Sequence, residues 1–245
     1  METRYFDSLT SCCKGLADFI TEASLAAVQA SGVFSLVLTG GRSPKILYEM
    51  LATAPYADKI PWPNTHLFWG DDRFLAPDHP DSNYGLAEKS LISRIDIPLA
   101  NIHPMPTTAD SALTGARIYE QDICRYFGVD QPPELTDDMA FPGFDLMLLG
   151  MGPDGHIASL FPGHDTLKSK RIVTAETKDS GTPPVPRITL TLPMINRSRD
   201  VVFLIAGEEK RNILQTILTD PDLAQTLYPA ALVRAQNRLI WFVAP

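Results

Sequence analysis

The sequence predicts an α/β protein built on one mostly parallel, doubly wound (Rossmann-like) sheet with helices on both faces. Short apolar runs typical of buried strands alternate with segments whose apolar residues recur at helical spacing. The run FDLMLLGMG (144–152) is apolar almost throughout, as expected of a strand covered on both faces. The proline-rich stretches at 131–143 and 182–187 are too short for linkers, so we assign residues 1–245 to a single domain.

The first strand and its flanking helices are predicted from apolar spacing and from glycine and proline positions. A helix is expected over residues 8–31, and Gly32 ends it. VFSLVLTGG (33–41) is typical of a strand that runs into two glycines. The next helix is expected to open at Pro44 with Ser43 as its N-cap, because proline favours the first helical position.

The middle of the chain continues the alternation. THLFWGDDR (65–73) indicates a second strand that ends in glycine and acids. DSNYGLAEKSLISRI (81–95) indicates a helix capped by Asp81 or Ser82, and a further helix is expected near 108–127.

The last third repeats the pattern. PRITLTLPMINRS leads into a strand at 200–210, followed by a helix through Leu218 and a terminal strand, NRLIWFVAP. Ligands of open α/β sheets bind beyond the carboxyl ends of the strands. The loops that follow the strands ending at Leu38, Trp69, Leu149 and Ala206 are therefore expected to form one site.

Charge and composition exclude several classes of protein. With 21 basic and 29 acidic residues the chain has a net charge of −8, which disfavours a general nucleic-acid binder. Charges at Glu2, Arg4 and Asp7 are unlike a signal peptide, and no apolar run approaches the roughly 18 residues that span a bilayer. The three cysteines show no disulfide or zinc pattern. We expect a soluble cytoplasmic protein without nucleic-acid or membrane partners.

The loop after the first strand, LTGGRSPKIL, is suited to an anion. Gly40 and Gly41 permit close backbone approach, Ser43 offers a hydroxyl, and the helix that follows presents free amides and the positive end of its dipole. Arg42 adds a positive charge. The spacing matches neither a Walker A loop nor a dinucleotide fingerprint, so an ordinary strand-to-helix turn stays open.

The loop after the second strand places Asp71, Asp72 and Arg73 together, with Asn83 at the start of the following helix. Carboxylates beside an arginine can position sugar hydroxyls or a reacting water. A solvated acid pair with its own internal salt bridge is the alternative, and on this segment alone it is favoured.

The segment LLGMGPDGHIASLFPGH (148–164) carries the strongest signal for chemistry. A histidine takes up a proton near neutral pH, and Asp154 is close enough in sequence to orient His156 or to stabilise its imidazolium. A metal site is disfavoured because no further ligands stand at metal spacing. No nucleophile elbow surrounds Ser159, so water is the expected nucleophile.

Two further cations come from separate elements near the same predicted edge. Arg187 begins PRITLT, and Lys210 follows the strand that ends before Gly207. Cations from different elements, together with the glycine loop, would bind a dianionic phosphate. For Lys210 alone, a solvated helix surface is the other interpretation.

Taken together, TGGRSPKILYEML, WGDDRFLAPDHPDSNYG, FDLMLLGMGPDGHIASLFPGH and PRITLTLPMINRSRDVVFLIAGEEK resemble the 6-phosphogluconolactonase family, in order from about residue 36 to 210. The resemblance implies hydrolysis of 6-phospho-D-glucono-1,5-lactone in the oxidative pentose phosphate pathway, with no metal or organic cofactor. Arg42 stands where the family usually has a serine, and Asp72 where it usually has a glutamate.

Matched motif by motif, the resemblance implies a role for each site residue. His156 would be the general base that activates water, supported by Asp154. Arg73 would contact the substrate. The phosphate-binding residues would be Gly41, Ser43, Arg187 and Lys210.

Two other functions are compatible with this pattern. A glucosamine-6-phosphate deaminase resembles the family in its Asp-Gly-His turn, but it carries a glutamate soon after the histidine, where this chain has no acid between His156 and Asp165. A non-catalytic sugar-phosphate sensor should carry a basic DNA-binding element, whereas this chain is net acidic.

Overall fold

The computed structural model describes residues 1–136, 139–178 and 180–245. Its centre is a six-stranded sheet. In spatial order the strands are β1 (Glu2–Tyr5), β9 (Arg238–Ala244), β8 (Asp200–Ala206), β5 (Leu146–Leu149), β2 (Phe34–Leu38) and β3 (Thr65–Trp69). Every neighbouring pair is parallel, which confirms the predicted doubly wound sheet.

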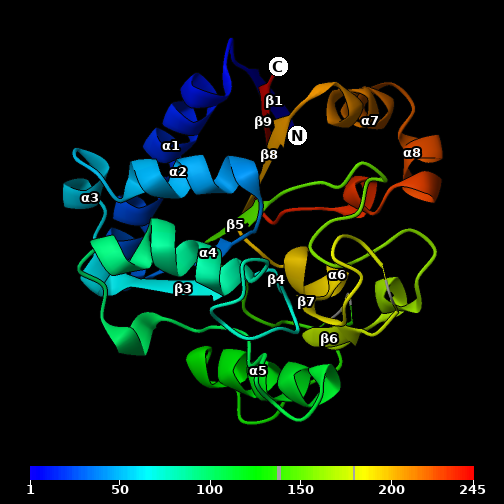
Figure 1. Cartoon of the computed structure of the whole chain (residues 1–245), viewed down its shortest axis with the longest axis horizontal. Coiled ribbons are helices and arrows are strands. Elements are labelled where there is room, and N and C mark those ends of the chain that lie inside the picture. The colour runs from blue at the N-terminus through cyan, green and yellow to red at the C-terminus, as the bar shows by residue number, and fades with distance from the viewer. Residues whose placement is uncertain (137–138, 179) are drawn as a thin grey trace.

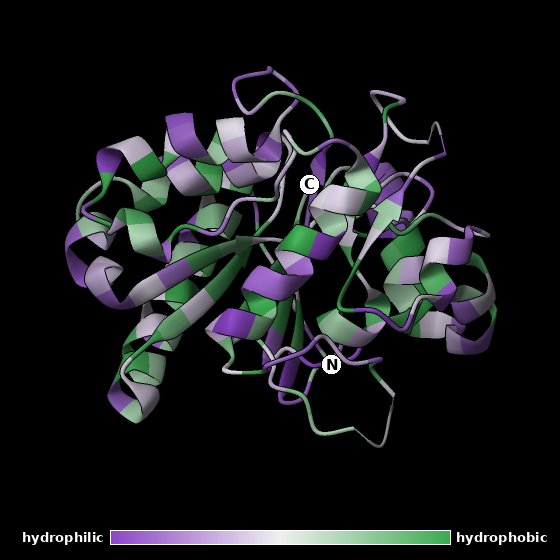
Figure 2. Cartoon of the chain, turned by 90° about the horizontal axis from the view of Figure 1, so that it is seen from below, coloured by the Kyte–Doolittle hydropathy of each residue, from purple (hydrophilic) through white to green (hydrophobic). Residues whose placement is uncertain are grey.

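Helices cover both faces of this sheet. They are α1 (Leu9–Ser31), α2 (Arg42–Leu51), α3 (Tyr56–Lys59), α4 (Asn83–Ser90), α5 (Ala112–Tyr126), α6 (Leu192–Ile195), α7 (Glu208–Thr219) and α8 (Pro221–Leu227). Figure 1 shows α1 and α2 on one side of β9 and β8, with α7 and α8 on the other. All residues of β2 and β5 are buried, as expected for strands between two helical layers. In Figure 2 the hydrophobic residues lie mainly toward the strands, and the hydrophilic residues mainly on the outer faces of the helices.

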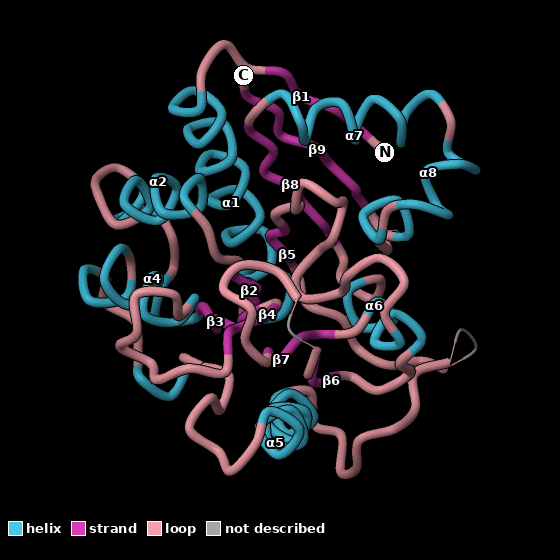
Figure 3. Tube along the Cα trace, turned by 45° about the vertical axis from the view of Figure 1, so that its right-hand side comes forward, coloured by secondary structure: helices cyan, strands magenta, loops and turns pink. Residues whose placement is uncertain are grey.

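A second sheet was not predicted. It is three-stranded and antiparallel, with β4 (Asp71–Arg73) and β6 (Val173–Glu176) on either side of β7 (Arg187–Leu190). The prediction of a single strand over 65–73 is therefore wrong, because Gly70 divides this segment into β3 and β4. The Gly70 amide donates to the Leu38 carbonyl of the main sheet, and its own carbonyl accepts from Leu190 of β7. Figure 3 shows that much of the chain around this smaller sheet consists of loops.

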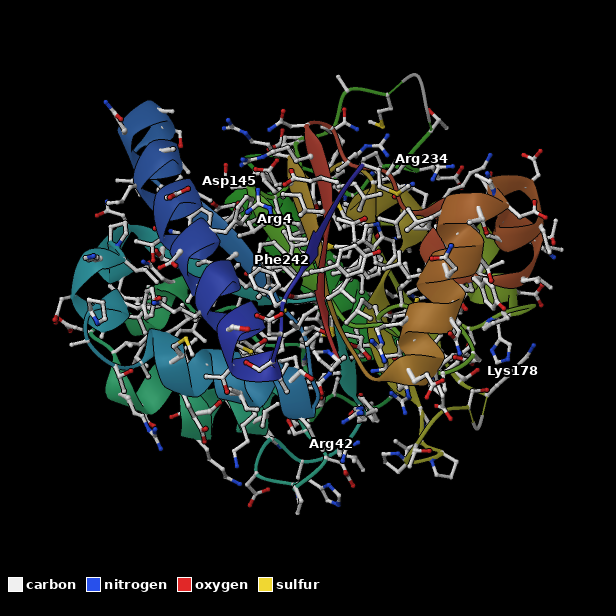
Figure 4. All side chains as sticks on the ribbon, turned by 90° about the horizontal axis from the view of Figure 1, so that it is seen from above. Arg4, Arg42, Asp145, Lys178, Arg234 and Phe242 are labelled. Atoms are coloured by element: carbon white, nitrogen blue, oxygen red, sulfur yellow. The ribbon has the colours of Figure 1, made fainter. Side chains whose placement is uncertain are left out.

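Local boundaries differ from prediction in two further places. The helix expected from Pro44 begins at Arg42, because Gly41 (φ 117°) is its N-cap, so the expectation that Ser43 caps it is wrong. The edge strand β1 was missed because its four residues are mostly polar, yet Arg4 lies over the Phe242 ring of β9 at 5.2 Å (Figure 4). Ser82 is confirmed as the cap of α4.

Candidate active site

A cleft of about 910 Å³ opens at the carboxyl edge of the main sheet. Segments 39–44, 150–154 and 207–210, which follow β2, β5 and β8, line it. Asp71 and Arg73 enter the wall from β4. The expectation that these four distant segments meet is confirmed, because parallel strands all point their carboxyl ends toward one edge.

His156 and Asp154 form a direct pair in the cleft wall. The His156 Nδ1 lies 2.6 Å from Asp154 Oδ1, and the same oxygen accepts the His156 amide at 3.2 Å. This contact fixes a proton on Nδ1 and leaves Nε2 as the basic nitrogen. Partial burial alone would raise the pKa of Asp154, but the hydrogen bonds and charge of His156 outweigh it and hold that pKa below its usual value. Asp154 therefore stays ionised.

The glycines of this turn are required by close approach. A Cβ at Gly152 would lie 2.0 Å from His156 Nδ1, so any side chain there would displace the imidazole. Gly155 has a φ of 78°, and a Cβ on it would meet the Tyr228 ring at 2.5 Å. Glycine at these two positions therefore allows the His156 ring and the Tyr228 ring to pack against the turn.

Two helices begin at the cleft with no side-chain cap. Gly41 precedes α2 and Gly207 precedes α7, both at positive φ, and neither helix start has a side-chain hydrogen bond. Their first amides and the positive ends of both dipoles are therefore available to an anion. Burial, and then the charge of Arg42, lower the pKa of Lys210. A bound anion would relieve that unfavourable environment.

Two arginines stand opposite each other where the smaller sheet meets the cleft. Arg73 of β4 pairs in register with Arg187 of β7, and both line the cleft. Arg187 is only 3% exposed, burial lowers its pKa, and its nearest acid, Asp71, lies 3.9 Å away. Within the described part of the chain, the Nε atoms of both arginines are buried without a hydrogen-bond partner. Such guanidinium groups are prepared to bind an anion.

Asp72 and Asn83 occupy different positions, although both were expected to bind substrate. The Asp72 carboxylate is absent from the described cleft wall, and accepts the amides of Arg73, Asn83 and Tyr84 and the Ser82 hydroxyl. Burial raises its pKa to about 6. The structure therefore places Asp72 as an anchor for the start of α4, away from the substrate position expected of it.

Asn83 does line the cleft, where its side-chain amide donates to the Asp71 carbonyl at 2.8 Å. A Cβ at Gly40 would lie 1.8 Å from Asn83 Oδ1, so glycine at this position lets the two loops touch.

Sequence reasoning missed some of the wall. Gly181 and Thr182, between β6 and β7, line the cleft, and the Gly-Thr-Pro-Pro run just before Arg187 was a signal of this turn. Ala158 also lines it, with a left-handed φ of 46°. Among residues 1–136, 139–178 and 180–245, no group of three or more His, Cys, Asp or Glu side chains could hold a metal ion.

A histidine–carboxylate pair facing a cation-lined pocket at the carboxyl edge of a parallel sheet defines a binding cleft for a small anionic molecule. Residues 7–241 match the family described as glucosamine-6-phosphate isomerases/6-phosphogluconolactonase. The chain belongs to this family.

Individual relatives agree with this assignment. The chain is 41% identical over 225 residues to a 6-phosphogluconolactonase of Synechocystis, covering 91% of this chain and 87% of that protein. A crystal structure of 6-phosphogluconolactonase from Thermotoga maritima superposes with a TM-score of 0.83 at 33% identity, covering 100% of this chain and 99% of the other. A monomeric glucosamine-6-phosphate deaminase, at 18% identity and a TM-score of 0.79, shares the fold.

Proposed function

We propose that this protein hydrolyses 6-phospho-D-glucono-1,5-lactone to 6-phospho-D-gluconate, a step of the oxidative pentose phosphate pathway. The observation that carries the proposal is the Asp154–His156 pair within the same cleft as two uncapped helix starts and Lys210. The names of the Synechocystis and Thermotoga relatives support the choice of substrate.

In the proposed mechanism His156 acts as the general base. Its Nε2 takes a proton from water as the water oxygen bonds to the lactone carbonyl carbon. The tetrahedral intermediate collapses with cleavage of the bond to the ring oxygen, which receives the proton back from His156. Asp154 holds the ring through Nδ1 and stabilises the imidazolium that forms in between.

The phosphate binds at the other end of the cleft. Gly40, Gly41 and Ser43 present the start of α2, while Arg42 and Lys210 supply positive charge from the two helix starts. The buried guanidinium of Arg187 completes this group. Because the phosphate is remote from the reacting carbon, its binding energy serves to orient the lactone against His156.

The sugar ring lies between these two ends. Arg73 and Asn83 line the cleft, and we assign them to the hydroxyl and carbonyl oxygens of the ring. Asp71 also reaches the wall but is 5% exposed, and its side chain is engaged inside the protein.

The proposed partner is thus a small sugar-phosphate lactone, without nucleic acid, metal or cofactor, and the proposed location is the cytoplasm. No helix in the described part of the chain is long and apolar enough to cross a membrane. Some relatives are named as chloroplastic proteins.

The proposal is tested by acidification on adding freshly prepared phosphogluconolactone, measured against its spontaneous hydrolysis. The expected result is proton release that rises with enzyme concentration. Ammonia release from glucosamine 6-phosphate would instead favour the deaminase. Tight phosphosugar binding with neither reaction would identify a binding protein.

A further inference from the structure

The turn that carries His156 is anchored at both ends. On its amino side, Gly152 donates its amide to the His156 carbonyl at 2.9 Å, and Ala230 donates to the Gly155 carbonyl at 3.0 Å. On its carboxyl side the chain reaches Ser159, which is 0% exposed. The position of the imidazole therefore depends on what holds Ser159.

Ser159 is held by two elements of the smaller sheet. Its hydroxyl donates to Asp71 Oδ2 of β4 at 2.6 Å, and its amide donates to Thr189 Oγ1 of β7 at 3.2 Å. Asp71 and Thr189 stand opposite each other in the β4–β7 register. The unpredicted second sheet thus forms a rigid seat under the catalytic turn.

One of the two residues between His156 and Ser159 is strained. Ala158 has a φ of 46°, a left-handed conformation that is unfavourable for a residue with a Cβ atom. Such backbone persists only where the surroundings over-determine it. Here Ile157 and Leu160, both 0% exposed, close the turn with a 2.8 Å hydrogen bond, and the contacts of Ser159 fix its end.

Asp71 is itself locked in place. It accepts the Asn83 side-chain amide at its carbonyl (2.8 Å) and more weakly at Oδ1 (3.3 Å), and Arg187 lies 3.9 Å from the Oδ2 that receives Ser159. Asp71 is 5% exposed, so it holds Ser159 with little competition from water.

We propose that Ser159 and Asp71 are positioning residues, which hold the left-handed turn at Ala158 and thereby aim His156 at the reacting carbon. The inference rests on the proposed lactonase function and adds to it. Ser159 is no nucleophile in this arrangement: its hydroxyl proton is committed to a buried carboxylate, and the residue is absent from the described cleft wall.

The test is Ser159→Ala, assayed for lactone hydrolysis and for calorimetric binding of 6-phosphogluconate. Loss of alignment should lower kcat by about 10- to 100-fold, since a misplacement of about 1 Å can cost that much. KM, the Kd of 6-phosphogluconate and the stoichiometry of binding should stay at wild-type values. A damaged fold would instead reduce the fraction of protein that binds.

The matched control is Ser198→Ala. Ser198 is equally buried, its hydroxyl has no partner among the described residues, and it lies outside the described cleft wall, so kcat should not change. If Ser159→Ala does not fold, Thr189→Val tests the same seat by removing the acceptor of the Ser159 amide. The loss of one such hydrogen bond, worth about 1 kcal/mol, should lower kcat about fivefold with binding retained.

Wild-type kcat in the folded Ser159→Ala variant overturns the inference, as does a loss of kcat that follows a loss of binding stoichiometry. Where Thr189→Val replaces it, wild-type kcat in that variant does the same. All three outcomes leave the lactonase proposal intact, because that proposal fails only if the wild-type protein does not hydrolyse the lactone.

Discussion

The longer helices of this protein begin in two different ways. Of the described helices with seven or more residues, four have a side chain that accepts a first-turn amide: Ser8 for α1, Ser82 for α4, Ser111 for α5 and Asp220 for α8. The other two, α2 and α7, follow glycines that offer no such group. The difference separates helix starts whose first amides bind a capping side chain from helix starts whose first amides have no such acceptor and, in the proposed function, bind the phosphate.

The contrast is sharpest beside the cleft itself. Helix α4 also begins there, but Ser82 and Asp72 take its first amides, so no donor is left for an anion. Glycine at an N-cap costs only a few tenths of a kcal/mol relative to a capping side chain, so α2 and α7 leave their first amides free with little loss of stability. In the proposed function, their free amides and Lys210 belong to the anion-binding end of the cleft, and Asp154 and His156 to the proton-transfer end.

The largest expected effect comes from removing the base. His156→Ala should lower kcat by about 10²- to 10⁴-fold, because general base catalysis contributes that range. Steady-state proton release measures it. His66→Ala is the control, since His66 lies near the amino end of β3, at the opposite edge of the sheet. Near-wild-type turnover by His156→Ala would show that His156 is not the general base.

The next effect comes from the uncapped helix starts. Lys210→Ala should raise KM by about 10- to 100-fold, the value of a charge-assisted hydrogen bond to phosphate, and change kcat little. Lys45→Ala removes the same charge from α2, but Lys45 is solvated and pairs with Glu49, so its KM should match wild type. An unchanged KM in Lys210→Ala would mean that α7 does not bind the anion.

The capped start of α4 has its own pH signature. Burial raises the pKa of Asp72 from 3.8 to about 6. At a pH between these two values, the folded state therefore holds a proton that the unfolded state has already released. Stability from this group is therefore present at low pH and lost as pH rises from about 4 to 6, by up to about 3 kcal/mol. The free energy of unfolding of the wild type minus that of Asp72→Asn, measured in urea, should fall as the pH rises across this window. A flat difference would contradict the burial argument.

The smallest effect is expected at the capped start of α1. Ser8→Ala should lower the free energy of unfolding by about 1 kcal/mol, because Ser8 and Ser11 cap the start of α1 reciprocally. Urea denaturation measures the loss, and kcat and KM should be unchanged. Altered kinetics with unchanged stability would show that capped and uncapped starts are not functionally distinct.

The sequence was sufficient for five of the six strands of the main sheet and for the loops at its carboxyl edge. Strands such as FSLVL and DVVFLIA are continuous apolar runs, and each ends at glycine or polar residues that expose the site. The Asp154–His156 contact could also be anticipated, because two residues of one tight turn must lie close together.

The smaller sheet could not be predicted from local signals. Asp71–Arg73 is a run of three charged residues that becomes a strand only by pairing with β7, more than a hundred positions away. Nothing local indicates that Arg187 is buried or that Asp72 holds a helix start. The start of α2 was misplaced because Gly41, in a conformation that suits glycine alone, ends the loop earlier than the proline suggests.

The central claim is that binding of the anion and transfer of the proton belong to opposite ends of one cleft. Calorimetric titration of 6-phosphogluconate into His156→Ala tests it most directly. The expected result is a Kd equal to that of the wild-type protein, although the variant has lost hydrolysis. A Kd about tenfold weaker, equivalent to 1.4 kcal/mol, would contradict the division and make His156 part of the anion site.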